Sequence, residues 1–116
     1  MRKQFNKVEG TKGEIKACNY LKKKKYKILE VNYRNRLGEI DIIAQQKKTI
    51  VFIEVKSRST LAFGRPSEAV DRRKQEKIKS VAMLYLIENK LTESQSRMDV
   101  IEMIGDNEIN HIINAF

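Results

Sequence analysis

The sequence predicts an α/β domain with two helices and a mixed sheet. Five strand-like runs fall into a group of three and a group of two, and a long helical segment separates the groups. An amphipathic segment precedes the first group, so the expected order of elements is αβββαββ. A strand, a helix and a strand follow one another over residues 49–104. This unit predicts a right-handed crossover and some parallel pairing in the sheet.

The first half of the chain supplies the first helix and three strands. Thr11 is expected to cap a helix in which Ile15, Cys18 and Leu21 recur at helical spacing. The alternation of side chains predicts three strands, which cover Tyr26–Tyr33, Glu39–Ala44 and Thr49–Val55. The short polar segment Gln45–Lys48 is expected to form the loop of a hairpin between the last two strands.

The second half supplies the second helix and the closing strands. The helix is predicted over Asp71–Asn89, with a basic first half and a second half that is apolar nearly all round. The closing strands are predicted over Met98–Ile104 and Ile109–Ile113. No repeat or linker interrupts residues 1–116, so a single domain is expected.

Composition favours a soluble protein that meets polyanions. The net charge of +9 comes from residues 1–37, which hold 12 Lys and Arg against three Glu, while residues 38–116 balance at 12 of each sign. A localised basic field attracts nucleic acid, although a solubilising surface would look the same. A single cysteine, no signal-peptide pattern at residues 1–25 and no run long enough to span a membrane predict a cytoplasmic location.

Charged residues stand in strands that otherwise look buried. In Thr49–Lys56, Glu54 and Lys56 share a face with Ile50 and Phe52, because successive side chains alternate. If Ala44 pairs with Thr49, Asp41 faces Phe52 and becomes a diagonal neighbour of Glu54 on the same face. A loop one residue longer or shorter would move Asp41 to the other face.

Two carboxylates that converge on a sheet repel one another, and a divalent cation removes that repulsion. Oxygen ligands favour Mg²⁺ or Mn²⁺ over zinc. Such an ion can polarise a phosphate and activate water, while Lys56 stabilises developing charge. The alternative is structural, with Glu54 paired to Lys56 at the strand end and Asp41 solvated.

Several motifs together resemble a known family. They comprise Lys12-Gly13-Glu14, Asn32-Tyr33-Arg34, Gly38-Glu39-Ile40-Asp41, Val51-Phe52-Ile53-Glu54-Val55-Lys56-Ser57-Arg58, Phe63-Gly64-Arg65-Pro66, Arg73-Lys74-Gln75 and Asn114-Ala115-Phe116. The chain resembles the YraN-like bacterial family, which is similar to archaeal Holliday junction resolvases within the PD-(D/E)xK nuclease superfamily. One departure is Ile40, which stands where the superfamily's name has proline.

The resemblance implies a restriction-endonuclease-like fold and assigns roles by position. It implies that Asp41 and Glu54 bind the metal, that Lys56 is catalytic, and that Glu14 reaches the site from the first helix. A solvated or capping glutamate is the alternative for Glu14. The resemblance also implies a homodimer, because junction resolvases act as symmetric dimers.

Further basic residues are candidates for contact with nucleic-acid phosphates, although each would serve equally as a solvated charge. They are Lys22, Lys23, Lys24, Lys25, Arg34, Arg58, Arg65, Arg72, Arg73 and Lys74. His111, which alternates with Ile109 and Ile113, is expected to be a packed or edge residue. Asp99 is expected to be a structural partner of Arg97.

Three functions therefore compete at the level of sequence. The first is a Mg²⁺- or Mn²⁺-dependent endonuclease that hydrolyses DNA phosphodiesters, at branched or repair intermediates. The second is a non-catalytic nucleic-acid-binding module that serves as a repair or recombination scaffold. The third is a protein-interaction subunit that works through the apolar half of the second helix. The set Asp41, Glu54 and Lys56 favours the first, since a pure binder has no evident need for converging carboxylates.

Overall fold

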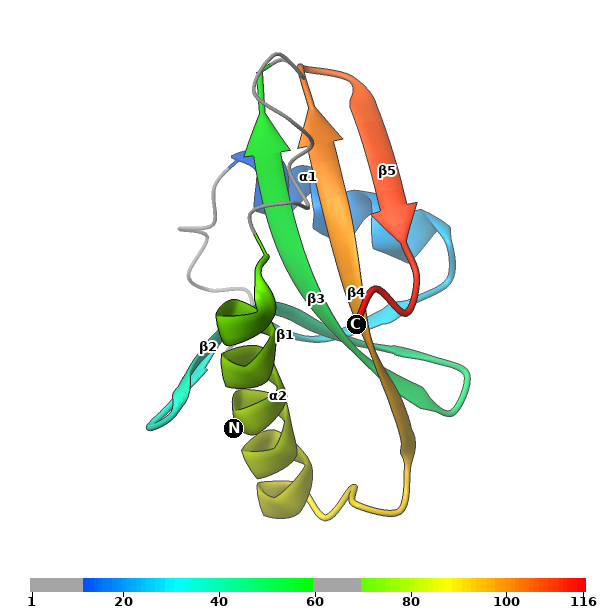
Figure 1. Cartoon of the computed structure of the whole chain (residues 1–116). Helices are drawn as coiled ribbons and strands as arrows, with labels where there is room; N and C mark the ends of the chain where they lie inside the picture. The colour runs from blue at the N-terminus through cyan, green and yellow to red at the C-terminus, as the bar shows by residue number, and fades with distance from the viewer. Residues whose placement is uncertain (1–11, 60–69) are drawn as a thin grey trace.

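The computed structural model describes residues 12–59 and 70–116, which form two helices and five strands (Figure 1). In chain order these are α1 (Lys12–Lys23), β1 (Lys27–Asn35), β2 (Gly38–Gln46), β3 (Thr49–Arg58), α2 (Arg72–Glu88), β4 (Gln95–Ile104) and β5 (Glu108–Ile112). The predicted mixed α/β class is confirmed. Thr11, the predicted cap of the first helix, lies outside the described residues.

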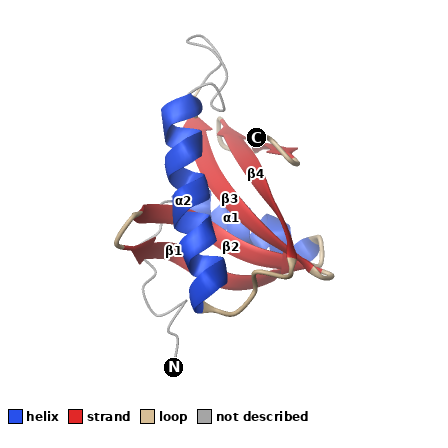
Figure 2. Ribbon diagram, turned by 60° about the horizontal axis from the view of Figure 1, so that its bottom comes forward, coloured by secondary structure: helices blue, strands red, loops and turns tan. Residues whose placement is uncertain are grey.

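All five strands form one sheet, and their spatial order follows the chain from β1 to β5. The neighbours pair antiparallel except for β3 and β4, which run parallel and are connected through α2. The parallel pairing expected for the strand–helix–strand unit is therefore confirmed. The two helices lie on opposite sides of the sheet, which gives three layers (Figure 2).

A separate apolar core fills each side of the sheet. Under α1, Ala17, Cys18 and Leu21 pack against strand residues that include Val51 and Ile53. Under α2, the other face of β3 contributes Ile50 and Phe52. The predicted alternation along β3 is thus confirmed, and it places Glu54 and Lys56 on the side that α2 covers.

The helix faces agree with the sequence in part. Asp71 caps α2, where its carboxylate accepts the backbone N–H of Lys74 at 2.9 Å, so the helix begins where the sequence predicted. Ile15, predicted to belong to the buried stripe of the first helix, is 42% exposed. The prediction was wrong for Ile15, because the buried face of α1 consists of Ala17, Cys18 and Leu21.

The predicted four-residue hairpin loop was also wrong. Gln45 and Gln46 continue β2, and only Lys47 and Lys48 connect it to β3, with Gln46 paired to Thr49. Lys47 adopts a left-handed backbone, φ 55°, which is what a two-residue hairpin requires. The pairing of β2 with β3 is therefore shifted by two residues from the predicted one. Within the paired segment each side chain keeps its predicted face of the sheet but has a different partner on the other strand.

Asp99 is the structural residue that the sequence indicated. It is fully buried and accepts Nε of Arg97 at 3.0 Å. His111 Nε2 lies 2.7 Å from the same carboxylate, and the backbone N–H of Asn114 donates to it at 2.9 Å. The prediction that His111 is packed is confirmed. Together these bonds anchor β5 and the end of the chain to β4.

In the part of the chain that the structure describes, no helix is long and apolar enough to cross a membrane.

Candidate active site

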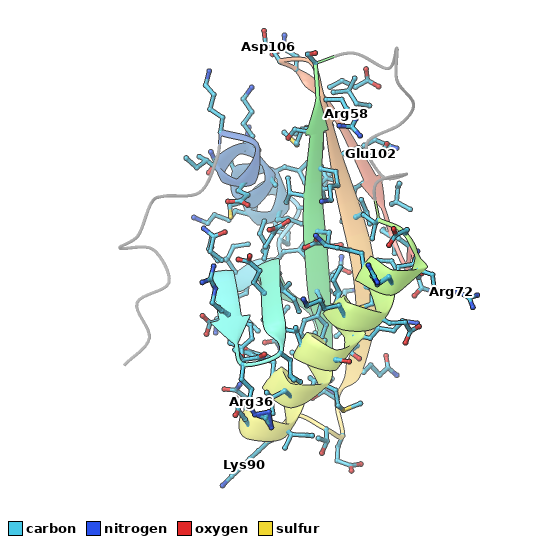
Figure 3. All side chains as sticks on the ribbon, turned by 60° about the vertical axis from the view of Figure 1, so that its left-hand side comes forward. Arg36, Arg58, Arg72, Lys90, Glu102 and Asp106 are labelled. Carbon is cyan, nitrogen blue, oxygen red and sulfur yellow. The ribbon has the colours of Figure 1, made fainter. Side chains whose placement is uncertain are left out.

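The candidate site lies where β2 and β3 separate. Their ladder runs from Gln46↔Thr49 to Ile42↔Ile53 and ends there, although β2 starts at Gly38 and β3 continues to Arg58. A cleft of about 530 Å³ is formed beside the separating ends. It is lined by Glu14, Asn32, Glu39, Asp41, Glu54, Val55, Lys56, Ser57, Arg58 and Lys74. Figure 3 shows the cleft's surroundings, with Arg58 near the end of β3 and Arg72 at the start of α2.

The side chain of Asp41 connects β2 to β3 just beyond the last backbone pair of the two strands. Its Oδ2 accepts a hydrogen bond from the backbone N–H of Val55 at 2.8 Å. A carboxylate oxygen thus satisfies a backbone donor of β3 beyond the point where β2 pairs with this strand. The predicted pairing of Asp41 with Phe52 was wrong, because Phe52 pairs with Ile43. Asp41 nevertheless lies next to Glu54, and the two side chains share a hydrogen bond.

The orientation of Asp41 also departs from the predicted alternation. Ile40 and Ile42, its neighbours on both sides, were expected on one face of the sheet. Ile42 packs in the core under α1 and Ile40 in the core under α2. The strand therefore switches faces at Asp41, which turns this side chain toward β3.

Glu54 is a buried carboxylic acid. Its side chain is 5% exposed. Its pKa is raised from 4.5 to about 7, first by burial and then by the charge of Asp41 and a hydrogen bond with that residue, while Lys74 and Lys56 lower it. Without a cation in the cleft, these two carboxylates thus favour holding a proton between them near neutral pH.

Two lysines face the carboxylates from different elements. Lys74 Nζ lies 3.5 Å from Glu54 Oε2, reaching over from the first turn of α2. Lys56 is half-buried and lines the cleft from β3, two residues after Glu54. The structure thereby brings Asp41, Glu54 and Lys56 together as predicted. Lys74, predicted only as a phosphate contact, is also an ion-pair partner of Glu54.

The remaining predicted residues are divided between the cleft and other surfaces. Glu14, in the first turn of α1, and Arg58 both line the cleft. Lys22–Lys25 lie at the opposite end of α1, eight residues or about 12 Å along the helix from Glu14. Arg34 is an exposed residue that pairs with Glu39 at 3.3 Å.

Arg72 and Arg73 are exposed in the first turn of α2. Arg65 lies outside the described residues.

Three lining residues with polar side chains were not singled out as site residues from the sequence: Asn32, Glu39 and Ser57. Of these, Asn32 could have been noticed in the sequence, because it is an asparagine among the β-branched and aromatic residues of a predicted strand. The other two become neighbours of the site only through the separation of β2 and β3, which no local pattern reveals.

The residues of the cleft fit a hard divalent cation with few protein ligands. Among residues 12–59 and 70–116, no group of three or more His, Cys, Asp or Glu stands ready to hold a metal ion. Asp41 and Glu54 would supply two carboxylates, which suits Mg²⁺, an ion that usually keeps several waters and takes one or two carboxylates and substrate phosphate. A cation there would also offset the conflict that raises the pKa of Glu54.

Comparison with known proteins identifies the family. The model of the uncharacterised protein family UPF0102 matches residues 13–103, which include the whole cleft. The chain belongs to this family. UPF0102 proteins from Clostridioides difficile and Alkaliphilus oremlandii are 52% and 53% identical to it, over 96% and 97% of this chain and 98% and 100% of theirs. A third, from Caldanaerobacter subterraneus, is 47% identical over the full length of both chains.

The UPF0102 match supports the resemblance to the YraN-like family that the sequence motifs suggested.

Proposed function

We propose that this UPF0102 protein is a metal-dependent endonuclease of the PD-(D/E)xK superfamily that hydrolyses DNA phosphodiester bonds. The observation that carries the proposal is the gathering of Asp41, Glu54, Lys56 and Lys74 in one cleft at the point where β2 and β3 separate. Two adjacent carboxylates, one of them almost fully buried, destabilise a fold unless a proton or cation joins them. Their placement is therefore explained by binding of a cation.

Each residue has a distinct task in this proposal. Asp41 and Glu54 would hold Mg²⁺ or Mn²⁺, which on binding polarises the scissile phosphate and lowers the pKa of a bound water. Asp41 is fixed in position by the Val55 N–H, which preorganises its carboxylate. Lys56 stabilises negative charge on the phosphate as it develops. Lys74 pairs with Glu54 in the metal-free protein, and would be available to contact the substrate if a cation replaced it as the partner of Glu54.

The basic residues around the cleft support a polyanionic substrate. Arg58 lines the cleft, and Arg72 and Arg73 project from the neighbouring start of α2. These cations can contact phosphates on either side of the one being cut. Lys22–Lys25, at the far end of α1, extend the basic surface to the other side of the sheet. The branched or repair intermediates, the homodimer and the cytoplasmic location that the family resemblance and composition indicate are part of this proposal.

A non-catalytic scaffold is the second candidate. It is favoured by one observation: the described part of the cleft offers two adjacent carboxylates but no third acid close enough to complete a metal cluster. A binding module would need the cations around the cleft and not the carboxylates. The two candidates therefore differ in what removal of Glu54 does to the protein's activity.

The deciding experiment incubates purified protein with four-way junction, flap, single-stranded and duplex DNA in Mg²⁺, Mn²⁺ or Ca²⁺. Glu54→Gln is run in parallel to exclude contaminating nucleases. The proposal predicts cleavage in Mg²⁺ or Mn²⁺ that disappears in the variant, and binding with little turnover in Ca²⁺. If wild type binds every substrate, cuts none, and no ion raises its melting temperature, the scaffold is the correct function.

A further inference from the structure

One of the residues that line the cleft, Asn32 in β1, has an unusual backbone conformation. This residue has φ 54°, in the left-handed region that strands do not use and that asparagine tolerates better than most residues. It is exposed and lines the cleft. Non-glycine residues held in this conformation cluster at functional sites, where the surrounding structure maintains them.

The conformation of Asn32 has a visible consequence for the strand. Val31 packs in the core under α1, while Tyr33 packs in the core under α2. In a regular strand residues two apart share a face, so β1 switches faces at Asn32. The partner strand switches at Asp41, between Ile42, which pairs with Val31, and Ile40, which pairs with Tyr33. Asn32 and Asp41 thus occupy matching positions on neighbouring strands, and both line the cleft.

The charges of the cleft show what a side chain at this position can do. The wall formed by β1 and β2 contributes the carboxylates of Glu39 and Asp41. The wall formed by β3 and α2 contributes three cations, Lys56, Arg58 and Lys74, against the single carboxylate of Glu54. A phosphate chain that enters the cleft is attracted on the second wall and repelled on the first. Among the described lining residues of the first wall, Asn32 alone carries a side-chain N–H donor.

We infer that Asn32 is a substrate-binding residue, whose amide donates a hydrogen bond to a phosphate oxygen of the bound strand on the acidic side of the cleft. This inference rests on the proposed function for its substrate. A neutral donor suits the position, because a lysine or arginine there would pair with Asp41 and compete with the cation. The side chain that lines the cleft thus belongs to the residue with the left-handed backbone.

The test separates the side chain of Asn32 from its backbone. Asn32→Gly keeps the left-handed conformation without strain and removes the amide. Asn32→Asp keeps the shape and replaces the donor with a carboxylate. The matched control is Asn114→Gly, since Asn114 is likewise an exposed asparagine with φ 58° but lies at the end of the chain, outside the lining of the cleft.

The readout is the dissociation constant for a fluorescent DNA duplex, measured by anisotropy in Ca²⁺ at several salt concentrations. Loss of one hydrogen bond to a charged group predicts binding about 10- to 100-fold weaker for Asn32→Gly, and weaker still for Asn32→Asp. The salt slope should not change, because no cation is removed. Asn114→Gly should bind as wild type does.

Wild-type affinity for DNA in either Asn32→Gly or Asn32→Asp would overturn the inference. If the glycine variant fails to fold, the affinity of Asn32→Asp decides the test. Either result would leave Asn32 with a conformational role only. Failure of the proposed function is seen elsewhere, as DNA that wild type binds but does not cut in Mg²⁺ or Mn²⁺.

Discussion

Replacing Glu54 with glutamine should make the metal-free protein more stable, which is the opposite of what removal of a buried ion-pair partner usually does. The folded protein raises the pKa of this carboxyl from 4.5 to about 7, chiefly through burial and the charge of Asp41. The folded state therefore holds the proton more tightly than the unfolded chain. The resulting stability is complete below about pH 4.5 and is lost as the pH rises through about 7.

The size of the effect follows from the same shift. A rise from 4.5 to about 7 corresponds to about 3 kcal/mol at pH 8, at 1.36 kcal/mol for each pKa unit. Glutamine stays neutral at every pH, so Glu54→Gln should avoid this loss. For a domain of this size, 3 kcal/mol raises the melting temperature by on the order of 10 °C. Near pH 4.5 the variant and wild type should melt at similar temperatures.

The assay is thermal unfolding in EDTA from pH 4.5 to pH 8, followed by circular dichroism. Glu39→Gln is the matched control, because Glu39 lines the same cleft but is 60% exposed and pairs with an exposed arginine, an interaction worth little. Addition of Mg²⁺ at pH 8 should stabilise wild type and leave Glu54→Gln unchanged. A wild-type stability that is flat with pH, with Glu54→Gln less stable throughout, would refute this reasoning and make the pair with Lys74 structural.

Three further predictions test other parts of the molecule. Asp41→Ala should unfold in urea at about 1 kcal/mol lower stability than Asp41→Asn, because only asparagine can still accept the Val55 N–H; equal stabilities would mean that this bond contributes nothing. Replacement of Lys22–Lys25 by glutamine should flatten the salt dependence of DNA binding, by about 0.9 for each duplex phosphate no longer contacted. An unchanged slope would assign the cluster to solubility. Asp99→Asn should cost about 3 kcal/mol in thermal unfolding, since it leaves the guanidinium of Arg97 without its buried charge partner; a cost below about 1 kcal/mol would contradict the anchoring role.

Much of the fold could be predicted because its signals are local. The alternation of β3 was readable directly, since Ile50 and Phe52 lie on one face and Val51 and Ile53 on the other. The cap at Asp71 was equally readable, because a carboxylate before a helical pattern has a specific backbone partner.

The parts that failed depend on non-local geometry. Gln45–Lys48 are four polar residues, and nothing in their sequence indicates where the strand ends. In the structure only Lys47 and Lys48 form the hairpin turn. The switch of faces at Asn32 and Asp41 breaks the period-two rule from which the orientation of Asp41 was predicted. The contact of Lys74 with Glu54 depends on how α2 lies across the sheet, which sequence spacing does not specify.

The candidate site was predicted in its composition but not in its architecture. Asp41 and Glu54 converge as predicted, although the register differs by two residues and β2 switches faces at Asp41. The separation of β2 from β3 beside the cleft has no local signal in the sequence, because both strands continue beyond the last paired residues.

The central claim is that Asp41 and Glu54 are gathered to hold a divalent cation. The most direct measurement is anomalous diffraction from crystals of the wild-type protein and of Glu54→Gln, each soaked in Mn²⁺ near pH 8. The claim predicts a strong anomalous peak between the two carboxylates in wild type, and its loss in the variant. Wild-type crystals with no peak there, in which Asp41 and Glu54 remain hydrogen-bonded to each other, would contradict it.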